Sequence, residues 1–164
     1  LAELFQQANE QGVTFTRLRD VLSQSSQLQL CDPSPSSWGQ GGYHDYWLND
    51  TNAWVIPEWE KAAAAMVNRC SRGVAHEADL ALLEQAAREL LLAQSSDWSF
   101  ILRSGTTTGL AKERIEQHLG RFWQLMAALD GYEPLPEGWL NDVSNDDSIF
   151  PLVQPLDWAK LPQP

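Results

Sequence analysis

Apolar residues recur at helical spacing through the second half of the chain and predict three main helices. These run from about Pro57 to Cys70, from Glu77 to Gln94 and from Gly109 to Leu129. In each segment an apolar stripe repeats every three or four residues and charged residues lie opposite it, as on a helix with one buried face. A shorter helix is predicted from about Trp139 to Val143. The pattern therefore predicts an all-α bundle.

The first 24 residues follow a different rhythm. Residues 1–10 carry apolar side chains on one helical face, and Gly12 is expected to end this helix. Residues 13–15 are typical of a short strand, and a second short helix follows them. Helix, strand and helix in succession indicate a remnant of an α/β layer over residues 1–24. Because Leu1 is not a start methionine and already lies in a helical pattern, we expect the chain to be a piece of a longer one.

An irregular, aromatic and glycine-rich loop is predicted over residues 25–53. Its serine, glutamine, glycine and proline content is typical of a flexible linker, but Trp38 and Trp47 argue against that interpretation. Ordered loops longer than about 15 residues are uncommon and are often functional. Eight tryptophans in 164 residues are also unusual. Since an indole suits both core packing and stacking on sugar rings, the two tryptophans leave burial and sugar binding equally open.

The charge balance excludes some partners. Eleven basic against 22 acidic residues give a net charge of −11, which repels phosphate backbones and anionic lipid. We therefore expect no nucleic-acid or membrane partner, and no stretch of the sequence is apolar enough for a membrane span. Cys31 and Cys70 are expected to be two buried thiols of a cytoplasmic protein.

No complete active site can be recognised from the residues. Nucleophile-elbow, zinc-protease and phosphate-loop motifs are absent from the sequence, and no cofactor or metal is expected. His44, His76 and His118 lack metal-ligand spacing, and each is expected to be a surface histidine or a hydrogen-bonded structural one. Arg114, His118 and Arg121 fall on one side of a predicted helix, where an ion-pair face toward a neighbouring helix is the favoured interpretation.

Asp97 and Trp98 lie where the second long helix is expected to break. A carboxylate beside an indole is a common sugar-site pairing, because the carboxylate accepts hydroxyl donors while the indole stacks. The alternative is that Asp97 or Ser96 caps a helix that restarts at Trp98.

Several strings together resemble the family-57 glycoside hydrolases, and among them the alpha-1,4-glucan branching enzymes. The loop segment Ser36-Ser37-Trp38-Gly39-Gln40-Gly41-Gly42 with Trp47-Leu48-Asn49 is similar to the segment that follows their catalytic barrel. Residues 85–94, continuing through Ser96-Asp97-Trp98-Ser99-Phe100-Ile101, resemble their C-terminal helical domain. The resemblance extends from about residue 1 to residue 151.

This resemblance implies the following organisation. Residues 1–24 would be the tail of an incomplete barrel, 25–53 a substrate-facing loop, 54–151 the C-terminal helical domain and 152–164 a proline-rich tail. The family's catalytic glutamate and aspartate would lie before Leu1, so this chain would hold no catalytic residue and would be inactive alone.

The resemblance also implies a role in binding. Trp38 and Trp47 would contact an α-glucan chain, and Asp97 and Trp98 would belong to the same wall. The partners would be the glucan and the missing barrel of the same polypeptide. The whole polypeptide would form α-1,6 branches, would need no cofactor and would be cytoplasmic. Two alternatives stay open: a helical protein-interaction module with structural tryptophans, and the same domain from an α-amylase-like hydrolase.

Overall fold

The computed structural model describes residues 1–160, apart from the side chain of Asn9. The chain divides into two compact units, Leu1–Pro35 and Ser36–Pro164. The described residues are helical and include no strand. The prediction of an all-α class is therefore confirmed.

The first unit contains two short helices, α1 (Ala2–Glu10) and α2 (Leu18–Gln24). Gly12 follows α1 with a φ of +72°, a conformation that glycine adopts without strain. The strand expected at residues 13–15 is wrong, because no neighbouring strand in residues 1–160 offers its backbone a hydrogen-bond ladder. Instead the Phe15 ring packs edge-on against Phe5 at 4.6 Å.

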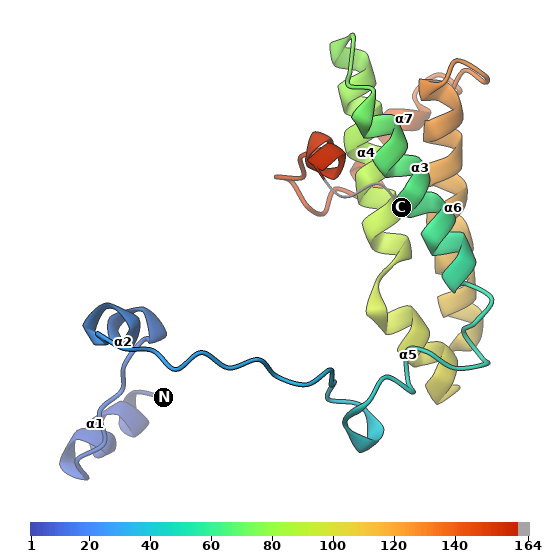
Figure 1. The fold of residues 1–164 in the computed structure, drawn as a ribbon. Coiled ribbons are helices and arrows are strands. Elements are labelled where there is room, and N and C mark those ends of the chain that lie inside the picture. The colour runs from blue at the N-terminus through green and yellow to red at the C-terminus, as the bar shows by residue number, and fades with distance from the viewer. Residues whose placement is uncertain (161–164) are drawn as a thin grey trace. The chain divides into compact units, whose positions relative to one another are not determined.

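The second unit is built around three long helices, α3 (Ile56–Ser71), α4 (Glu77–Ala93) and α6 (Thr108–Leu129). Figure 1 shows α3 and α4 running alongside α6, and the most extensive packing joins α4 to α6. Their predicted boundaries are confirmed to within a few residues. The apolar stripes meet in one core, whose largest fully buried apolar side chains include Met66, Leu83, Leu90, Ile115, Phe122 and Leu125.

Two shorter helices complete the ends of this bundle. The predicted break after α4 is confirmed, since α5 (Ser96–Ser104) starts there and stops at Gly105, which has a φ of +77°. At the other end, α7 (Trp139–Asp146) packs against α4.

The segment predicted as a proline-rich tail contributes to the bundle. Residues Pro155–Lys160 form a short 3-10 helix that packs against α3, with Pro155 buried and Trp158 against the core. The Trp158 indole provides the apolar surface for this packing. The proline-rich composition of the segment did not indicate such a contact. Residues 161–164 of the predicted tail lie outside the described residues.

None of the helices in residues 1–160 combines the length and apolar composition that crossing a lipid bilayer requires.

Candidate functional site

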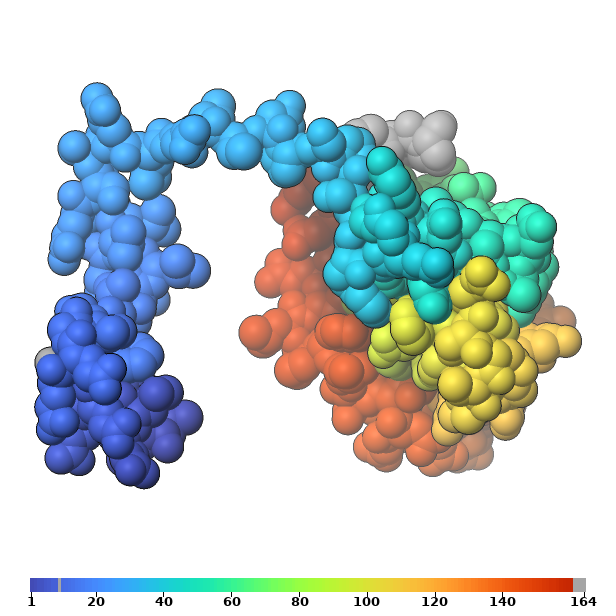
Figure 2. All heavy atoms as spheres, turned by 90° about the horizontal axis from the view of Figure 1, so that it is seen from below, coloured from blue at the N-terminus to red at the C-terminus, as the bar shows by residue number. Residues whose placement is uncertain are grey.

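Four aromatic side chains from the loop and α5 form a connected group, which we call the aromatic cluster: Trp38, Tyr46, Trp47 and Phe100. The Trp38 ring lies 5.1 Å from Trp47, edge to face, and 5.5 Å from Phe100. Tyr46 stacks on Phe100 with centroids 4.8 Å apart and planes 19° apart. Phe100 therefore joins the loop tryptophans to α5. Figure 2 shows the loop (cyan) lying beside α5 (yellow) on one face of the bundle.

Trp38 is the exposed member of this cluster. Its side chain is supported on one side by Trp47 and Phe100, yet 78% of the residue surface remains open to solvent. Trp47 is half-buried. Burial under the bundle, the alternative that the sequence left open, is therefore excluded for Trp38 and applies only in part to Trp47. An exposed indole held by other rings offers a flat apolar face in a fixed orientation.

The loop approaches itself closely at Gly39. A Cβ atom on Gly39 would lie 2.8 Å from Cζ3 of Trp47 and 2.8 Å from the carbonyl oxygen of Tyr43. Ser37 accepts a hydrogen bond from the Gly39 N–H at 3.0 Å and donates one to the Tyr43 carbonyl. Residue 39 is thus a glycine because there is no room for a side chain, and not because its backbone conformation requires a glycine.

We expect Gly39→Ala to disrupt the aromatic cluster. The added methyl group must displace either the Trp47 ring or the loop backbone, and overpacking of this kind costs about 1–3 kcal/mol. Near-ultraviolet circular dichroism should lose part of its tryptophan signal while the helical signal persists. Gly109→Ala is the matched control, since nothing lies within 4 Å of a Cβ there. An unchanged spectrum for Gly39→Ala would show that the loop is not packed as described.

Asp97 and Trp98, the other predicted site residues, have different environments. Asp97 lies exposed in the first turn of α5, three residues before Phe100 and so on the same side of the helix, and no described residue bonds its carboxylate. Trp98 packs against the core, and its indole N–H donates to the Leu92 carbonyl oxygen at 2.7 Å. Ser95 is the cap residue and makes no side-chain bond, so neither Ser96 nor Asp97 caps α5.

Two members of the cluster, Tyr46 and Phe100, were not among the residues predicted from the sequence. Tyr46 lies next to Trp47 in the loop, and Phe100 lies one helical turn beyond Asp97. The spacing of Asp97 and Phe100 on a predicted helix was the available signal. No sequence pattern indicated that Phe100 contacts the loop.

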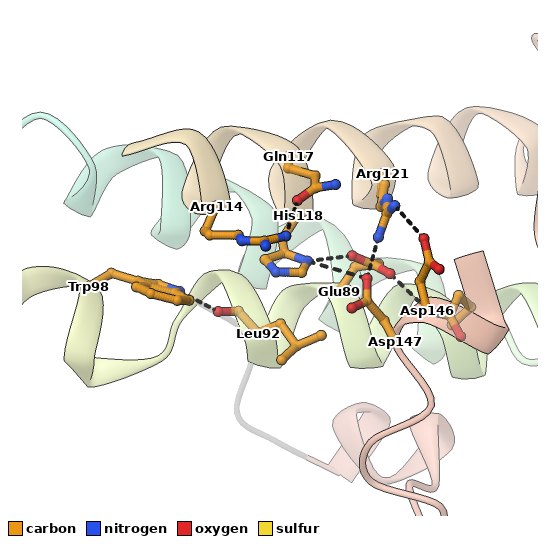
Figure 3. Close-up of polar contacts among 10 residues, drawn as sticks. Glu89, Leu92, Trp98, Arg114, Gln117, His118, Arg121, Asp146 and Asp147 are labelled. Atoms are coloured by element: carbon orange, nitrogen blue, oxygen red, sulfur yellow. Dashed lines mark hydrogen bonds and ion pairs between the residues drawn. The ribbon is translucent and has the colours of Figure 1, made fainter. Parts of the chain in front are cut away.

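A second group of polar residues lies between α4, α6 and the end of α7, with Glu89 and His118 buried at its centre (Figure 3). Nδ1 of His118 lies 2.8 Å from Oε2 of Glu89, which is fully buried, and 3.7 Å from Oδ2 of Asp147. Arg121 pairs with Asp147 and with Asp146, at 3.2 Å in the second case. The predicted ion-pair face is thus confirmed for His118 and Arg121. It is wrong for Arg114, whose guanidinium bonds Gln117 on its own helix at 2.9 Å.

Glu89, His118 and Asp147 are close enough together to suggest a metal site. However, Gln85 donates to Glu89 at 2.8 Å, His118 bonds the other oxygen of Glu89, and Arg121 pairs with Asp147. These bonds satisfy the carboxylates with the protein's own donors and cations. Because Glu89 and His118 are also buried, we interpret the group as a structural network that fastens α4, α6 and α7 together.

Burial raises the pKa of Glu89 above its ordinary value, against the opposing effect of the His118 and Gln85 hydrogen bonds. The native state therefore holds this proton more tightly than the unfolded chain does. The contribution to stability is fully present below the ordinary glutamate pKa and is lost as pH rises through the native value.

We expect the stability advantage of the wild-type chain over Glu89→Gln to be greatest at acidic pH and to shrink toward neutral pH. Urea unfolding of both chains between about pH 4 and pH 7 measures this difference. The contributions of the carboxylates that both chains contain cancel in the difference between the two unfolding free energies. A stability advantage that grew with pH would show that the His118 hydrogen bond, rather than burial, determines the direction of the Glu89 pKa shift.

The cysteines and remaining histidines have simple environments. Cys70 is buried, which raises the pKa of its thiol to about 11 and keeps it protonated. Cys31 is exposed, so the expectation that both thiols are buried is wrong for Cys31, which lies in the open part of the loop. His44 and His76 are exposed.

Comparison with known proteins gives a consistent result. Residues 58–158 match the family described as "1,4-alpha-glucan branching enzyme, C-terminal". A 1,4-alpha-glucan branching enzyme of Thermococcus kodakarensis is 31% identical over 137 residues, which are 82% of this chain and 20% of that protein. A probable 1,4-alpha-glucan branching enzyme of Mycobacterium tuberculosis is 25% identical over 93% of this chain and 30% of its own length. The chain thus spans less than a third of these relatives.

Solved structures agree with this comparison. A GH57-type branching enzyme from Pyrococcus horikoshii superposes with a TM-score of 0.83 at 27% identity, over 96% of this chain and 31% of the other. The alpha-amylase AmyC from Thermotoga maritima superposes with a TM-score of 0.74 at 27% identity, over 94% and 28%. Both the sequence match and the fold point to the same domain. The chain therefore belongs to the family of 1,4-alpha-glucan branching enzyme C-terminal domains.

Proposed function

We propose that this domain contributes one wall of a glucan-binding cleft in an enzyme that transfers α-1,4-glucan segments to form α-1,6 branches. The observation that carries the proposal is the exposed Trp38 indole, supported by Trp47 and Phe100. A sugar ring has apolar faces that pack on an indole and hydroxyl groups around its edge. The nearby Asp97 carboxylate, which no described residue bonds, is free to accept hydroxyl hydrogen bonds.

The four predicted site residues contribute to the proposed glucan-binding wall to different extents. Trp38 offers an exposed ring and Trp47 offers the part of its ring that is left uncovered. Trp98 has already used its N–H on Leu92, so only its uncovered ring surface is available, and we place it at the margin of the wall.

Transfer to a sugar acceptor requires that water be kept from the intermediate while the acceptor is held. We propose that the catalytic glutamate and aspartate lie in a barrel belonging to the same polypeptide, so that this chain alone does not branch amylose. Exposed apolar side chains of the first unit, such as Leu18 and Val21, support an origin of residues 1–24 in that barrel. Cytoplasmic location and independence of cofactors remain predictions.

The similarity to an alpha-amylase favours a second candidate, in which the same wall serves a hydrolase. The glucan would contact the same tryptophans in both cases, and the two enzymes would differ in whether water or a sugar accepts the segment. A branch assay on the complete polypeptide separates the candidates: new α-1,6 linkages indicate transfer, and reducing ends without new branches indicate hydrolysis.

A tryptophan-fluorescence titration with maltoheptaose tests the binding proposal. We expect a saturable change for this chain that is lost in Trp38→Ala and reduced in Trp47→Ala. A change that persists unaltered in both variants would place the sugar elsewhere and would remove the support for a glucan wall at the cluster. That result would favour the alternative in which the domain is a helical protein-interaction module with structural tryptophans.

A further inference from the structure

We infer that Asn52 is a positioning residue for the aromatic cluster, holding the loop that carries Trp38 and Trp47 at a fixed height over α5. The inference rests on the proposed function, because it explains how the loop is held in the position that glucan binding requires. Asn52 is fully buried, which is exceptional for a polar residue within the exposed loop.

The Asn52 side chain bonds to three backbone groups, two within its own loop and one in α5. Its Oδ1 atom accepts from the Asn49 N–H at 3.0 Å. Its Nδ2 group donates to the Tyr46 carbonyl oxygen at 3.2 Å and to the Ser99 carbonyl oxygen at 3.4 Å. The last of these bonds joins the loop to α5 across 47 positions of sequence. An asparagine amide has two hydrogens to donate and one oxygen to accept, so this site uses every group that the side chain has.

These bonds lie beside the ring contacts that build the cluster. Tyr46, whose carbonyl Asn52 holds, stacks its ring on Phe100, and Phe100 follows directly after Ser99, the second carbonyl that Asn52 holds. Asn52 therefore ties together the backbone on both sides of the Tyr46–Phe100 stack. Trp38 and Trp47 pack on the same Phe100 ring, so their positions depend on that stack.

Asn52 does not contact a ligand itself, because none of its surface is exposed. Its effect on glucan binding must pass through the rings. This separates it from Trp38, whose removal deletes contact area directly. It also makes the role measurable, because the geometry of the rings can be followed without any sugar.

Two substitutions test the inference. Asn52→Leu keeps similar bulk and removes all three bonds, while Asn52→Asp keeps the acceptor for Asn49 and points an oxygen at the two carbonyls. We expect both to weaken maltoheptaose binding about tenfold, toward the level of Trp38→Ala, in titrations corrected for the folded fraction. Asn141→Asp is the control, because Asn141 is exposed on α7.

The second measurement needs no ligand. Proton–proton contacts between the Phe100 ring and the rings of Tyr46 and Trp38 should be visible by NMR in the wild-type chain and lost in both Asn52 variants, while contacts within the α4–α6 core persist. Retained ring contacts in either variant would overturn the inference. So would wild-type affinity in a variant that has lost them.

The outcomes also separate this inference from the proposed function. If Trp38→Ala binds maltoheptaose as well as the wild-type chain does, the proposed function fails, whatever the Asn52 variants do. If Trp38→Ala loses affinity while Asn52→Leu and Asn52→Asp keep it, the glucan wall stands and the positioning role of Asn52 is wrong.

Discussion

Replacing Trp38 by alanine should lower the transfer activity of the complete polypeptide about tenfold or more while leaving its stability nearly unchanged. The expected loss corresponds to about 1.4 kcal/mol or more of transition-state stabilisation, which is within reach of a stacking contact together with the apolar area that it buries. Because Trp38 is 78% exposed, its removal leaves no cavity in the core. Initial rates with amylose and urea unfolding of the same preparations measure the two quantities.

Trp54→Ala is the matched control for this experiment. Trp54 is also an exposed tryptophan of the second unit, but it lies outside the aromatic cluster and lines a separate pocket together with Leu102 and Lys112. We expect Trp54→Ala to retain transfer activity. Equal losses of folding stability and activity in Trp38→Ala would instead indicate that the indole is a packing residue.

Replacing Glu89 by alanine should have the largest effect on folding, a loss of about 3–5 kcal/mol in the free energy of unfolding. The substitution removes the fully buried carboxylate that bonds His118 and Gln85. It leaves those two polar groups buried without their partner, which costs more than the pair itself contributes. Denaturant unfolding monitored by helical circular dichroism gives the measurement.

Glu113→Ala is the control for this prediction. Glu113 is exposed on α6, so its removal should change the unfolding free energy by no more than about 0.5 kcal/mol. The maltoheptaose affinity of folded Glu89→Ala should equal that of the wild-type chain, because the network is buried away from the aromatic cluster. A small stability loss for Glu89→Ala would contradict the structural role that we give to the network.

The helices were predictable because their signal is local. Apolar residues every three or four positions locate α3, α4 and α6, and Gly105 and the change at Ser95 locate α5. The strand at residues 13–15 was wrong because a strand is defined by its partner, which local propensity does not reveal. The contribution of Pro155–Lys160 to the bundle was missed for a similar reason, since its burial depends on contact with a distant helix.

The candidate site was predictable in its residue types and less so in its geometry. The rarity of tryptophan and the length of the loop drew attention to Trp38 and Trp47, but only the family resemblance selected them as glucan contacts, since the residues alone left burial equally open. Phe100 and Asn52 could not be selected, because their roles come from contacts between the loop and α5. The buried network between α4 and α6 was anticipated from the spacing of His118 and Arg121, whereas its acidic partners lie elsewhere in the sequence.

The proposed function requires a glucan chain to contact the aromatic cluster. An NMR titration of the eight indole N–H signals with maltoheptaose tests it most directly, since each tryptophan is observed separately. We expect saturable shifts for Trp38 and Trp47 and unchanged signals for Trp54 and Trp123. Saturable shifts confined to other tryptophans, or no shift at Trp38 and Trp47 at millimolar sugar, would contradict it.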